Sequence, residues 1–473
     1  MEKSSFTPDA GGTAAGGTTA ADAGAANAGT ADSAADPSPG TAGGAAQTTL
    51  RLTADDLERA GQLLREGELV IFPTETVYGL GAMADDDAAV QKIFRVKGRP
   101  ADNPLIVHVA DRKMAADYAA DMPDIACCLF ESFSPGPLTL IVNRRPHRVP
   151  AAAAGHNTIA LRIPSSSIAR ALIAETGAGI AAPSANRSGR PSPTTFDMAW
   201  HEMNGNVAAI IEGPSCELGL ESTIVYCGTQ GCPRILRPGS ISSAMINRAL
   251  KIAGLRQLEK TAPLTDPTGP IPADHVPAPG TRYRHYAPRT PLKLYQNVDE
   301  LRNALSAAEG NGQVWLIVPD PAFTVNFHSS DYSQNRSEKK TAVQRSVHGG
   351  YPNNLRDMHD AAESAVGRSR RQIIRIKSTA DYARNLYRIF YEIDRAAIDR
   401  SAIEGGAAIE AGAASVILAW LPPETADTVA ADTEGAAEIA ADIGEVAEAT
   451  VADTAALRDR LQRAAHSNGL LPC

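Results

Sequence analysis

The sequence has no uninterrupted apolar run approaching the roughly 18 residues that a membrane-spanning helix needs. Its N-terminus also lacks a basic region followed by an apolar one, which is the arrangement of a secretory signal. We therefore expect a soluble, cytoplasmic protein that does not contact a membrane.

Cysteine is scarce, and the spacing of the cysteines matches no metal-binding or redox motif. The six cysteines form no C-x-x-C pair and have no histidine partners at the spacing of a zinc finger. This pattern disfavours a structural zinc site and predicts reduced, mostly buried thiols. We expect no metal site made by protein side chains.

The motifs of several catalytic classes are missing as well. There is no G-x-x-x-x-G-K-[ST] loop, and YGLGAM at 78–83 is a poor match to G-x-G-x-x-G. His201 and Glu202 are not followed by the second histidine of an H-E-x-x-H metal motif, and Ser184 lacks a G-x-S-x-G elbow. What remains is a set of hydroxyl, amide and cationic side chains at predicted strand ends. Such groups suit nucleotidyl transfer, which needs mainly positioning and charge neutralisation when the attacking group is already a carboxylate.

The net charge of −9 hides an uneven distribution. Residues 1–48 carry −4 and residues 421–456 carry −9, so the rest of the chain carries +4. The part expected to fold is therefore mildly basic, which permits a nucleotide or RNA partner.

The amino-acid composition changes along the chain and divides it into segments. Residues 1–48 are almost entirely Ala, Gly, Thr, Asp and Ser and predict a disordered tail. Residues 49–258 alternate predicted strands and helices without the regular repeat of a doubly wound nucleotide fold, which predicts one mixed α/β domain. Its strands are expected at 69–72, 105–109, 138–142, 158–163, 179–183, 207–212, 223–226 and 234–237, the last two as a hairpin. Its helices are expected at 53–66, 112–118, 123–133, 166–175 and 242–254, and a further helix is expected to be capped by the aspartates at 85–87 and to end before Gly98.

The second half is less regular. Residues 259–290 are rich in proline and glycine and predict an extended linker. Residues 291–473 predict a smaller parallel α/β domain that ends in a helix over 455–465. Within it, the polar stretch 320–370 and the Ala- and acid-rich stretch 422–454 predict flexible insertions.

Residues 69–111 organise the first domain, because they predict a strand, a loop, a helix, a loop and a second strand. Val77 to Gly81 are expected to form a loop whose glycines let the backbone pass close to another group. Lys97 and Arg99 lie on a glycine-proline loop between two predicted strands, which suits an anionic group such as phosphate. A solvated turn is the simpler alternative for that loop.

The strings PTETVYGLG at 73–81 and KGRPADNPLIVHV at 97–109 closely resemble the YrdC/Sua5 family, the threonylcarbamoyl-AMP synthases. The resemblance is dense over about 50–290 and looser beyond, where both insertions and the leader depart from the family. It implies an α/β protein with a YrdC-like mixed twisted sheet domain that has an open ligand cavity, plus a smaller Rossmann-like parallel α/β C-terminal domain.

The resemblance also implies an activity. Threonine and bicarbonate would give N-carboxy-threonine, whose carboxylate attacks ATP to yield threonylcarbamoyl-AMP and pyrophosphate, the first step toward N6-threonylcarbamoyladenosine at tRNA position 37. Mg2+ would accompany ATP and bridge its phosphate oxygens. The partners implied are L-threonine, bicarbonate, ATP and the downstream tRNA threonylcarbamoyl-transfer machinery, with weak direct tRNA binding as a further expectation.

The family's K-x-R and S-x-N signatures are both present, and they imply four catalytic residues: Lys97, Arg99, Ser184 and Asn186. The resemblance places Thr76, His108, Arg162, Ala182 and Ser222 at threonine. It places Arg99, Asn103, Thr158, Ser184, Ser192 and Arg237 at ATP.

The linker string GTRYRHYAP at 280–288 resembles the segment that reaches back over the catalytic cavity in the two-domain Sua5 form. Its rings could exclude water and stack on a base, and Tyr286 is the expected nucleotide contact. A packed interdomain linker is the alternative.

Simpler roles also fit single residues. His108 could be a core histidine, Arg162 the outward residue of a strand, Ser222 a partner of the backbone and Arg237 a surface charge.

Two other functions fit the chain less well. An RNA-binding module predicts basic residues spread over one face, whereas the cations here gather at loops. The hydrogenase-maturation carbamoyltransferases carry zinc-binding cysteine pairs and an acylphosphatase segment, and both are missing here.

Overall fold

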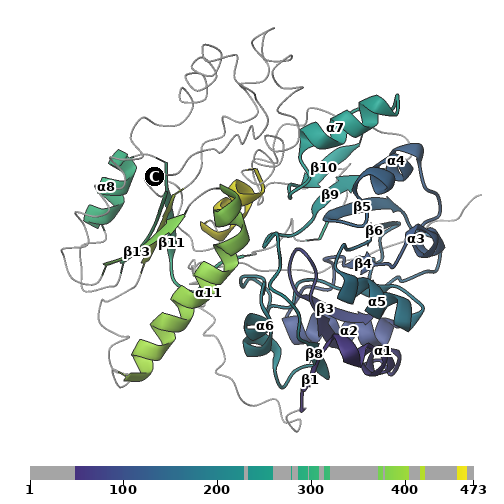
Figure 1. Cartoon of the computed structure of the whole chain (residues 1–473), viewed down its shortest axis with the longest axis horizontal. Helices are drawn as coiled ribbons and strands as arrows, with labels where there is room; N and C mark the ends of the chain where they lie inside the picture. Colours follow the sequence, from purple (N-terminus) through teal and green to yellow (C-terminus); the bar gives the residue numbers. More distant parts are fainter. Residues whose placement is uncertain are drawn as a thin grey trace, which may run out of the picture. The chain divides into compact units, whose positions relative to one another are not determined.

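The computed structural model describes residues 48–227, 233–258, 278–279, 286–296, 298–307, 314–319, 371–376, 379–403, 416–420 and 455–465 (Figure 1). Nearly all of the predicted tail, most of the linker and the insertions at 320–370 and 422–454 lie outside the described residues. We call 48–258 the N-terminal region and 286–465 the C-terminal region.

The N-terminal region is built on one mixed ten-stranded sheet, in the order β1-β8-β2-β3-β7-β4-β6-β5-β9-β10. Adjacent strands β4 and β6 are parallel, whereas β5 and β6 are antiparallel, and the predicted hairpin of β9 and β10 is confirmed. The strands are β1 Leu50–Leu52, β2 Val70–Phe72, β3 Gly79–Met83, β4 Ile106–His108, β5 Leu138–Asn143, β6 Thr158–Arg162, β7 Ile180–Ala181, β8 Ala209–Ile211, β9 Thr223–Tyr226 and β10 Arg234–Arg237.

Helices cover both faces of this sheet. In β2, Ile71 joins one hydrophobic cluster while Val70 and Phe72 join another, because successive side chains of a strand point to opposite faces. The expected helices are present, and α1 packs against α5 as α4 does against α7 (Figure 1). Their bounds are η1 Ala54–Asp56, α1 Leu57–Arg65, α2 Asp87–Lys97, α3 Arg112–Tyr118, α4 Asp124–Phe133, α5 Ser167–Thr176, α6 Phe196–Met203 and α7 Ser243–Ile252.

The helix ends follow the sequence signals. Asp86 caps α2 by accepting hydrogen bonds from the amides of Ala88 and Ala89, and Gly98 ends it in the left-handed conformation. This ending turns the chain directly into the loop that carries Arg99. The predicted helix at 53–66 is also confirmed, with a capping box at Thr53 and a first turn of 3-10 type.

The predicted loop at 77–81 is wrong in part, because Gly79 begins strand β3. A Cβ on Gly81 would lie 2.8 Å from the Phe72 ring and 2.9 Å from Ile180. The close neighbours of this glycine are therefore side chains of the core, and not a ligand. Strand β1 and helix α6 were not predicted either.

The C-terminal region contains a four-stranded, all-parallel sheet in the order β11-β14-β12-β13. The sequence predicted a helix over 381–394 with a separate cap at 397–398, but α11 is a single element, and β13 was not predicted. The elements are β11 Leu292–Tyr295, α8 Val298–Ala307, β12 Val314–Pro319, β13 Arg371–Ile376, α11 Thr379–Ile403 and β14 Val416–Trp420, followed by the predicted helix over 455–465. No helix in the described part of the chain is both long and apolar enough to cross a membrane.

Candidate active site

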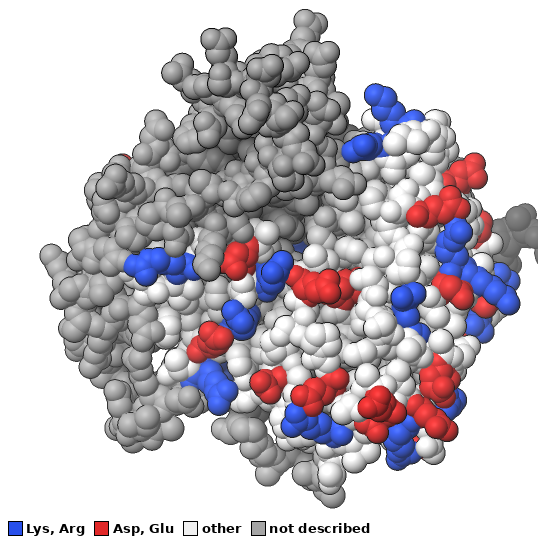
Figure 2. Space-filling view, viewed as in Figure 1, with Lys and Arg blue, Asp and Glu red and all other residues white. Residues whose placement is uncertain are grey.

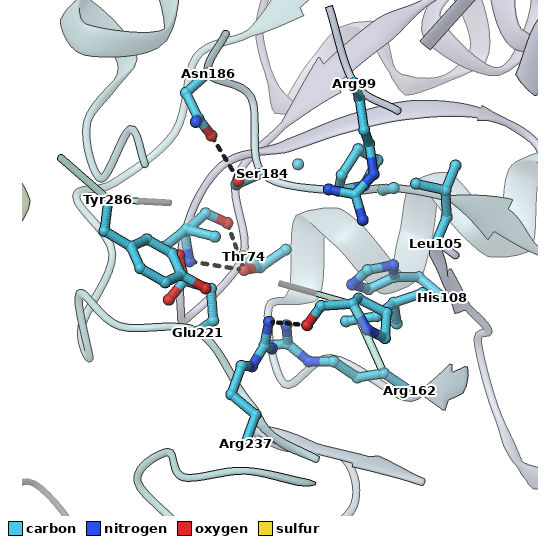
Figure 3. A pocket seen from close by; sticks show the side chains of 16 residues that line it. Thr74, Arg99, Leu105, His108, Arg162, Ser184, Asn186, Glu221, Arg237 and Tyr286 are labelled. Atoms are coloured by element: carbon cyan, nitrogen blue, oxygen red, sulfur yellow. Dashed lines mark hydrogen bonds between the residues drawn. The ribbon is translucent and has the colours of Figure 1, made fainter. Parts of the chain in front are cut away.

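A cavity opens at the ends of strands from the middle of the mixed sheet (Figure 3). Three arginines and one histidine line it together with a single carboxylate, which belongs to Glu221. The lining residues are Thr74, Val77, Gly79, Arg99, Leu105, Ile106, His108, Arg162, Ala182, Pro183, Ser184, Asn186, Glu221, Arg237, Pro279 and Tyr286.

The K-x-R and S-x-N strings meet at this cavity, as the resemblance implies. Arg99, Ser184 and Asn186 line it, and Figure 3 shows the Ser184 hydroxyl bonded to the Asn186 side chain. That hydroxyl donates to Asn186 Oδ1 over 2.6 Å, while Asn186 Nδ2 donates to the carbonyls of Arg187 and Arg190. Asn186 therefore fixes both the serine and the loop that follows it.

Lys97 is not among the lining residues. Its Nζ donates to the carbonyl oxygens of Ser184 and Asn186, each over 2.5 Å, so it ties α2 to the S-x-N loop from behind. Burial, followed by the nearby charge of Arg99, holds the pKa of Lys97 well below its usual value. In this structure the lysine shapes the loop instead of pointing an ammonium into the cavity.

Arg99 points into the cavity from the loop after α2 (Figure 3). Its Nε donates to the carbonyl of Asn103 over 3.2 Å, and its terminal nitrogen Nη2 donates to that of Pro104 over 2.9 Å. The side chain of Asn103 is buried, and neither its amide nitrogen nor its amide oxygen has a hydrogen-bond partner. A buried amide in that state is a candidate ligand contact, since unpaired buried polar groups are costly.

We call Glu75, His108 and Arg162 the first wall. Arg162 ends β6 beside His108 at the end of β4, because the register of these parallel strands pairs the two residues. Arg162 is only 3% exposed and forms an ion pair with Glu75 over 2.7 Å, so the alternative of an outward surface residue is wrong. Burial alone would raise the pKa of Glu75, but the charge and hydrogen bond of Arg162 outweigh it and lower the pKa. Glu75 Oε2 has no hydrogen-bond partner.

His108 is a neutral imidazole in this setting. Burial, followed by the charge of Arg162, lowers its pKa to about 3. Its Nδ1 is buried without a hydrogen-bond partner, and the ring lines the cavity beside Arg162 (Figure 3). His108 is thus both packed against Phe72, as a core histidine would be, and exposed to the cavity.

We call Glu221, Arg237 and Tyr286, which line the cavity, together with Ser192, which lies one contact behind them, the second wall. Ser192 donates to Glu221 Oε1 over 2.7 Å. Arg237 is buried and donates to the carbonyls of Ser222 and Pro279, so its alternative as a surface charge is wrong (Figure 3). Burial alone would raise the pKa of Glu221, but the charges of Arg460 and then Arg237 hold it below its usual value.

The remaining predicted residues differ in their distance from the cavity. Ala182 lines it directly. Thr76 and Ser222 lie one contact behind the lining, because their hydroxyls are 2.9 Å from the Thr74 hydroxyl and 3.1 Å from Arg237 respectively. Thr158 is not brought to the cavity: it begins β6 four residues before Arg162, which is about 13 Å along a strand.

Sequence reasoning missed Glu221 and Glu75 as parts of the site. Glu221 directly precedes the predicted Ser222, and Glu75 lies between two threonines of the polar turn, so both were adjacent to residues already selected. A third missed residue is Arg460, which has a signal of its own. It shares a helical face with Leu457, Leu461 and Ala464, where an arginine is unexpected unless it is paired.

Comparison with known proteins identifies the family. The Sua5/YciO/YrdC family model, described as telomere recombination, matches residues 62–239. A second model, described as the threonylcarbamoyl-AMP synthase C-terminal domain, matches 241–417. A threonylcarbamoyl-AMP synthase of Bacillus subtilis is 42% identical over 52% of this chain and 68% of its own length. The chain belongs to the two-domain Sua5 family of threonylcarbamoyl-AMP synthases.

Other family members give the same picture. The synthase of Pyrococcus abyssi is 42% identical over 48% of this chain and 64% of its own length, so the matched stretches span about two thirds of these relatives. Its crystal structure in complex with L-threonine resembles this chain with a TM-score of 0.61 and 27% identity, over 90% of this chain and 98% of that one. The likeness confirms the predicted combination of a mixed-sheet domain and a parallel α/β domain.

The surface charges differ from those expected of an RNA-binding module. On the face shown in Figure 2, Lys and Arg are interspersed with Asp and Glu over the described residues. Several exposed cations of the described residues are in ion pairs, including Arg51 with Glu212 and Arg112 with Glu131. Three further arginines, Arg99, Arg162 and Arg237, line the cavity.

Proposed function

We propose that this member of the Sua5 family condenses L-threonine, bicarbonate and ATP to threonylcarbamoyl-AMP and pyrophosphate. The observation that carries the proposal is the meeting of Arg99, Arg162 and Arg237 with Ser184 and Asn186 around one cavity. Such a cavity offers positive charge and hydrogen-bond donors to a polyanion and one short carboxylate, and the one acid that lines it is already paired.

The first wall suits the amino acid. Arg162 can hold a substrate carboxylate with the part of its guanidinium fork that Glu75 does not occupy, and Glu75 fixes the plane of that fork. His108, being neutral, can accept or donate a hydrogen bond through Nδ1 without adding a charge next to Arg162. This arrangement supports the predicted threonine site, as does the fact that the Pyrococcus relative was crystallised with L-threonine.

The loop side of the cavity suits the phosphates. Arg99, Ser184 and Asn186 face the same space, and Lys97 fixes the loop that carries two of them (Figure 3). In the reaction the carbamate oxygen of N-carboxy-threonine attacks the α-phosphorus, and the bond from that phosphorus to the pyrophosphate oxygen breaks. Arg99 would neutralise charge that grows on the departing pyrophosphate, which is the kind of stabilisation that exceeds other single contributions.

The predicted Mg2+ would arrive with ATP. The described residues contain no group of three or more His, Cys, Asp or Glu side chains able to hold a metal ion, and Glu221 is already engaged by Arg460. The side chains of the cavity therefore do not fit a resident metal. An ion held by phosphate oxygens and water fits better, since Mg2+ keeps several waters in such complexes.

The test is pyrophosphate release by the purified full-length protein. Pyrophosphate should appear only when ATP, Mg2+, bicarbonate and threonine are all present, and serine in place of threonine should give much less. Transfer of the product to tRNA by a downstream machinery should then depend on this protein. Pyrophosphate release that does not require threonine or bicarbonate would contradict the proposed reaction.

A further inference from the structure

Arg460 is a charged residue in an apolar setting. It lies on the helix over 455–465 of the C-terminal region, between buried Leu457 and Leu461, and its side chain is 0% exposed. Its Nε donates to Glu221 Oε2 over 2.8 Å, and its terminal nitrogen Nη2 donates to the carbonyl of Pro238 over 3.2 Å. The third guanidinium nitrogen contacts Asp459. The arginine is thus aimed out of its own helix at the second wall of the cavity.

Glu221 is held from two regions of the chain. Its Oε1 accepts from Ser192 over 2.7 Å, within the N-terminal region. Its Oε2 accepts from Arg460 and, over 3.0 Å, from the hydroxyl of Tyr387 on α11. Among the described residues, the one carboxylate that lines the cavity therefore has one oxygen bonded from the N-terminal region and the other bonded, with a counter-charge, from the C-terminal region.

Tyr286 is fixed by the same two side chains. Its ring stacks on Tyr387, with centroids 5.6 Å apart and planes 19° apart. The Arg460 guanidinium lies 4.9 Å from the centre of the Tyr286 ring, an arrangement in which a cation is attracted to the ring face. Two members of the second wall, one acidic and one aromatic, thus share Arg460 and Tyr387 as supports.

We propose that Arg460 and Tyr387 are positioning residues for the nucleotide half of the site, so that ATP binding depends on the C-terminal region. The inference rests on the proposed function, and it assigns that region a role at the cavity. Without Arg460, Glu221 would be a buried carboxylate that has lost its directly bonded counter-charge and keeps only the more weakly acting Arg237, beside the place proposed for a triphosphate. The excess negative charge would repel the phosphates, and the Tyr286 ring would lose the guanidinium that lies over it.

The test compares substitutions by their separate effects on ATP and on threonine. Arg460→Met and Tyr387→Phe are made in the full-length protein, with KM for ATP and kcat from pyrophosphate release and with Kd for threonine and for ATP from calorimetry. We expect Arg460→Met to raise KM and Kd for ATP by about 10- to 100-fold and Tyr387→Phe by about 2- to 10-fold, as for lost hydrogen bonds to a charged group. The Kd for threonine should stay within about twofold, because the first wall contacts neither residue.

Two matched controls separate positioning from stability. Arg388→Met removes an exposed arginine of α11, and Tyr295→Phe removes a buried tyrosine hydroxyl that donates to the Ile317 carbonyl inside the C-terminal sheet. Both controls should keep the wild-type KM for ATP. Glu221→Gln added to Arg460→Met should recover part of the lost ATP affinity, since the uncompensated charge is then gone.

Wild-type KM and Kd for ATP in Arg460→Met and Tyr387→Phe would overturn the inference, as would equal weakening of ATP and threonine. If Arg460→Met does not fold, Arg460→Lys and Tyr387→Phe test the inference instead. The same comparison applies: the change in Kd for ATP against the change in Kd for threonine. A wild-type protein that releases no pyrophosphate would instead overturn the proposed function, and the Kd values for ATP would still test the role of Arg460.

Discussion

The two walls of the cavity differ in where their parts come from. In the first wall, Arg162 and Glu75 are 87 positions apart but both belong to the N-terminal sheet region, and strand register alone places His108 beside Arg162. In the second wall, Glu221 meets Arg460 across 239 positions, on an element of the other region. The first wall is therefore fixed once the mixed sheet forms, whereas the second depends on contact between regions.

This difference predicts that threonine binding and ATP binding respond to different substitutions. Changes in the first wall should act on threonine and on the stability of the N-terminal region. Changes where the regions touch should act on ATP and leave threonine binding in place. The experiments below test that separation, beginning with the largest expected effect.

Glu75→Ala should destabilise the protein most, because it leaves the buried guanidinium of Arg162 without its counter-charge. Removing one partner of a buried ion pair costs about 3–5 kcal/mol of unfolding free energy. Denaturant unfolding should show this loss, and calorimetry should show weaker threonine binding with less change for ATP.

The matched control is Glu175→Ala, which breaks the exposed pair with Arg65. It should cost no more than about 1 kcal/mol, as surface pairs do. Similar losses from both variants would mean that the Glu75–Arg162 pair is not the support of the first wall.

Gly219→Ala should affect the contact between regions. Gly219 has φ of +72°, and a Cβ there would lie 2.2 Å from the Arg384 carbonyl oxygen of α11, which is backbone and cannot rotate away. The helix would have to move, and with it the Tyr387 hydroxyl that supports Glu221. We expect a loss of about 1–3 kcal/mol in unfolding free energy and a several-fold rise in KM for ATP.

Gly177→Ala is the control for backbone conformation. Gly177 has φ of +71°, but nothing lies within 4 Å of its Cβ position. It should cost only the penalty for a left-handed alanine, about 1–2 kcal/mol, without any change in KM for ATP. An ATP effect of equal size in both variants would show that the contact between regions does not control nucleotide binding.

The sequence pointed to members of both walls, but it missed both carboxylates, Glu75 and Glu221, and the supports that Arg460 and Tyr387 give to the second wall. Arg162 and His108 end buried strands, and strand ends gather in space, so local patterns together with the family resemblance pointed to them. Lys97 was predicted as a catalytic residue on a phosphate-binding loop, and spacing does not show that its ammonium would bind two backbone carbonyls of the S-x-N loop instead of facing the cavity.

The pairing of Glu221 with Arg460 is of a different kind. Nothing in either string indicates the other, since the pairing requires the C-terminal region to fold and pack against the loop at 219–221. The glycine-rich start of β3 and the arginine-containing β13 were missed because glycine and charged residues are poor strand signals. In the folded protein, pairing with neighbouring strands outweighs these weak local preferences.

The smallest expected effect is a dependence on pH that belongs to the first wall. The folded-state pKa of His108 is about 3, below the value of about 6.5 expected in an unfolded chain, so unfolding takes up a proton wherever the pH lies between the two. The contribution to stability is complete above pH 6.5 and is lost progressively as the pH falls. At pH 5.5 the wild type should have lost about 1.4 kcal/mol of unfolding free energy relative to pH 7.5 through this residue alone.

Urea unfolding of the wild type and of His108→Gln at both pH values isolates the effect, because the variant lacks the imidazole. Parallel losses in the two proteins would mean that the imidazole is protonated in the folded state, which would add a second charge beside Arg162 and change the hydrogen bonds that the first wall can offer to threonine.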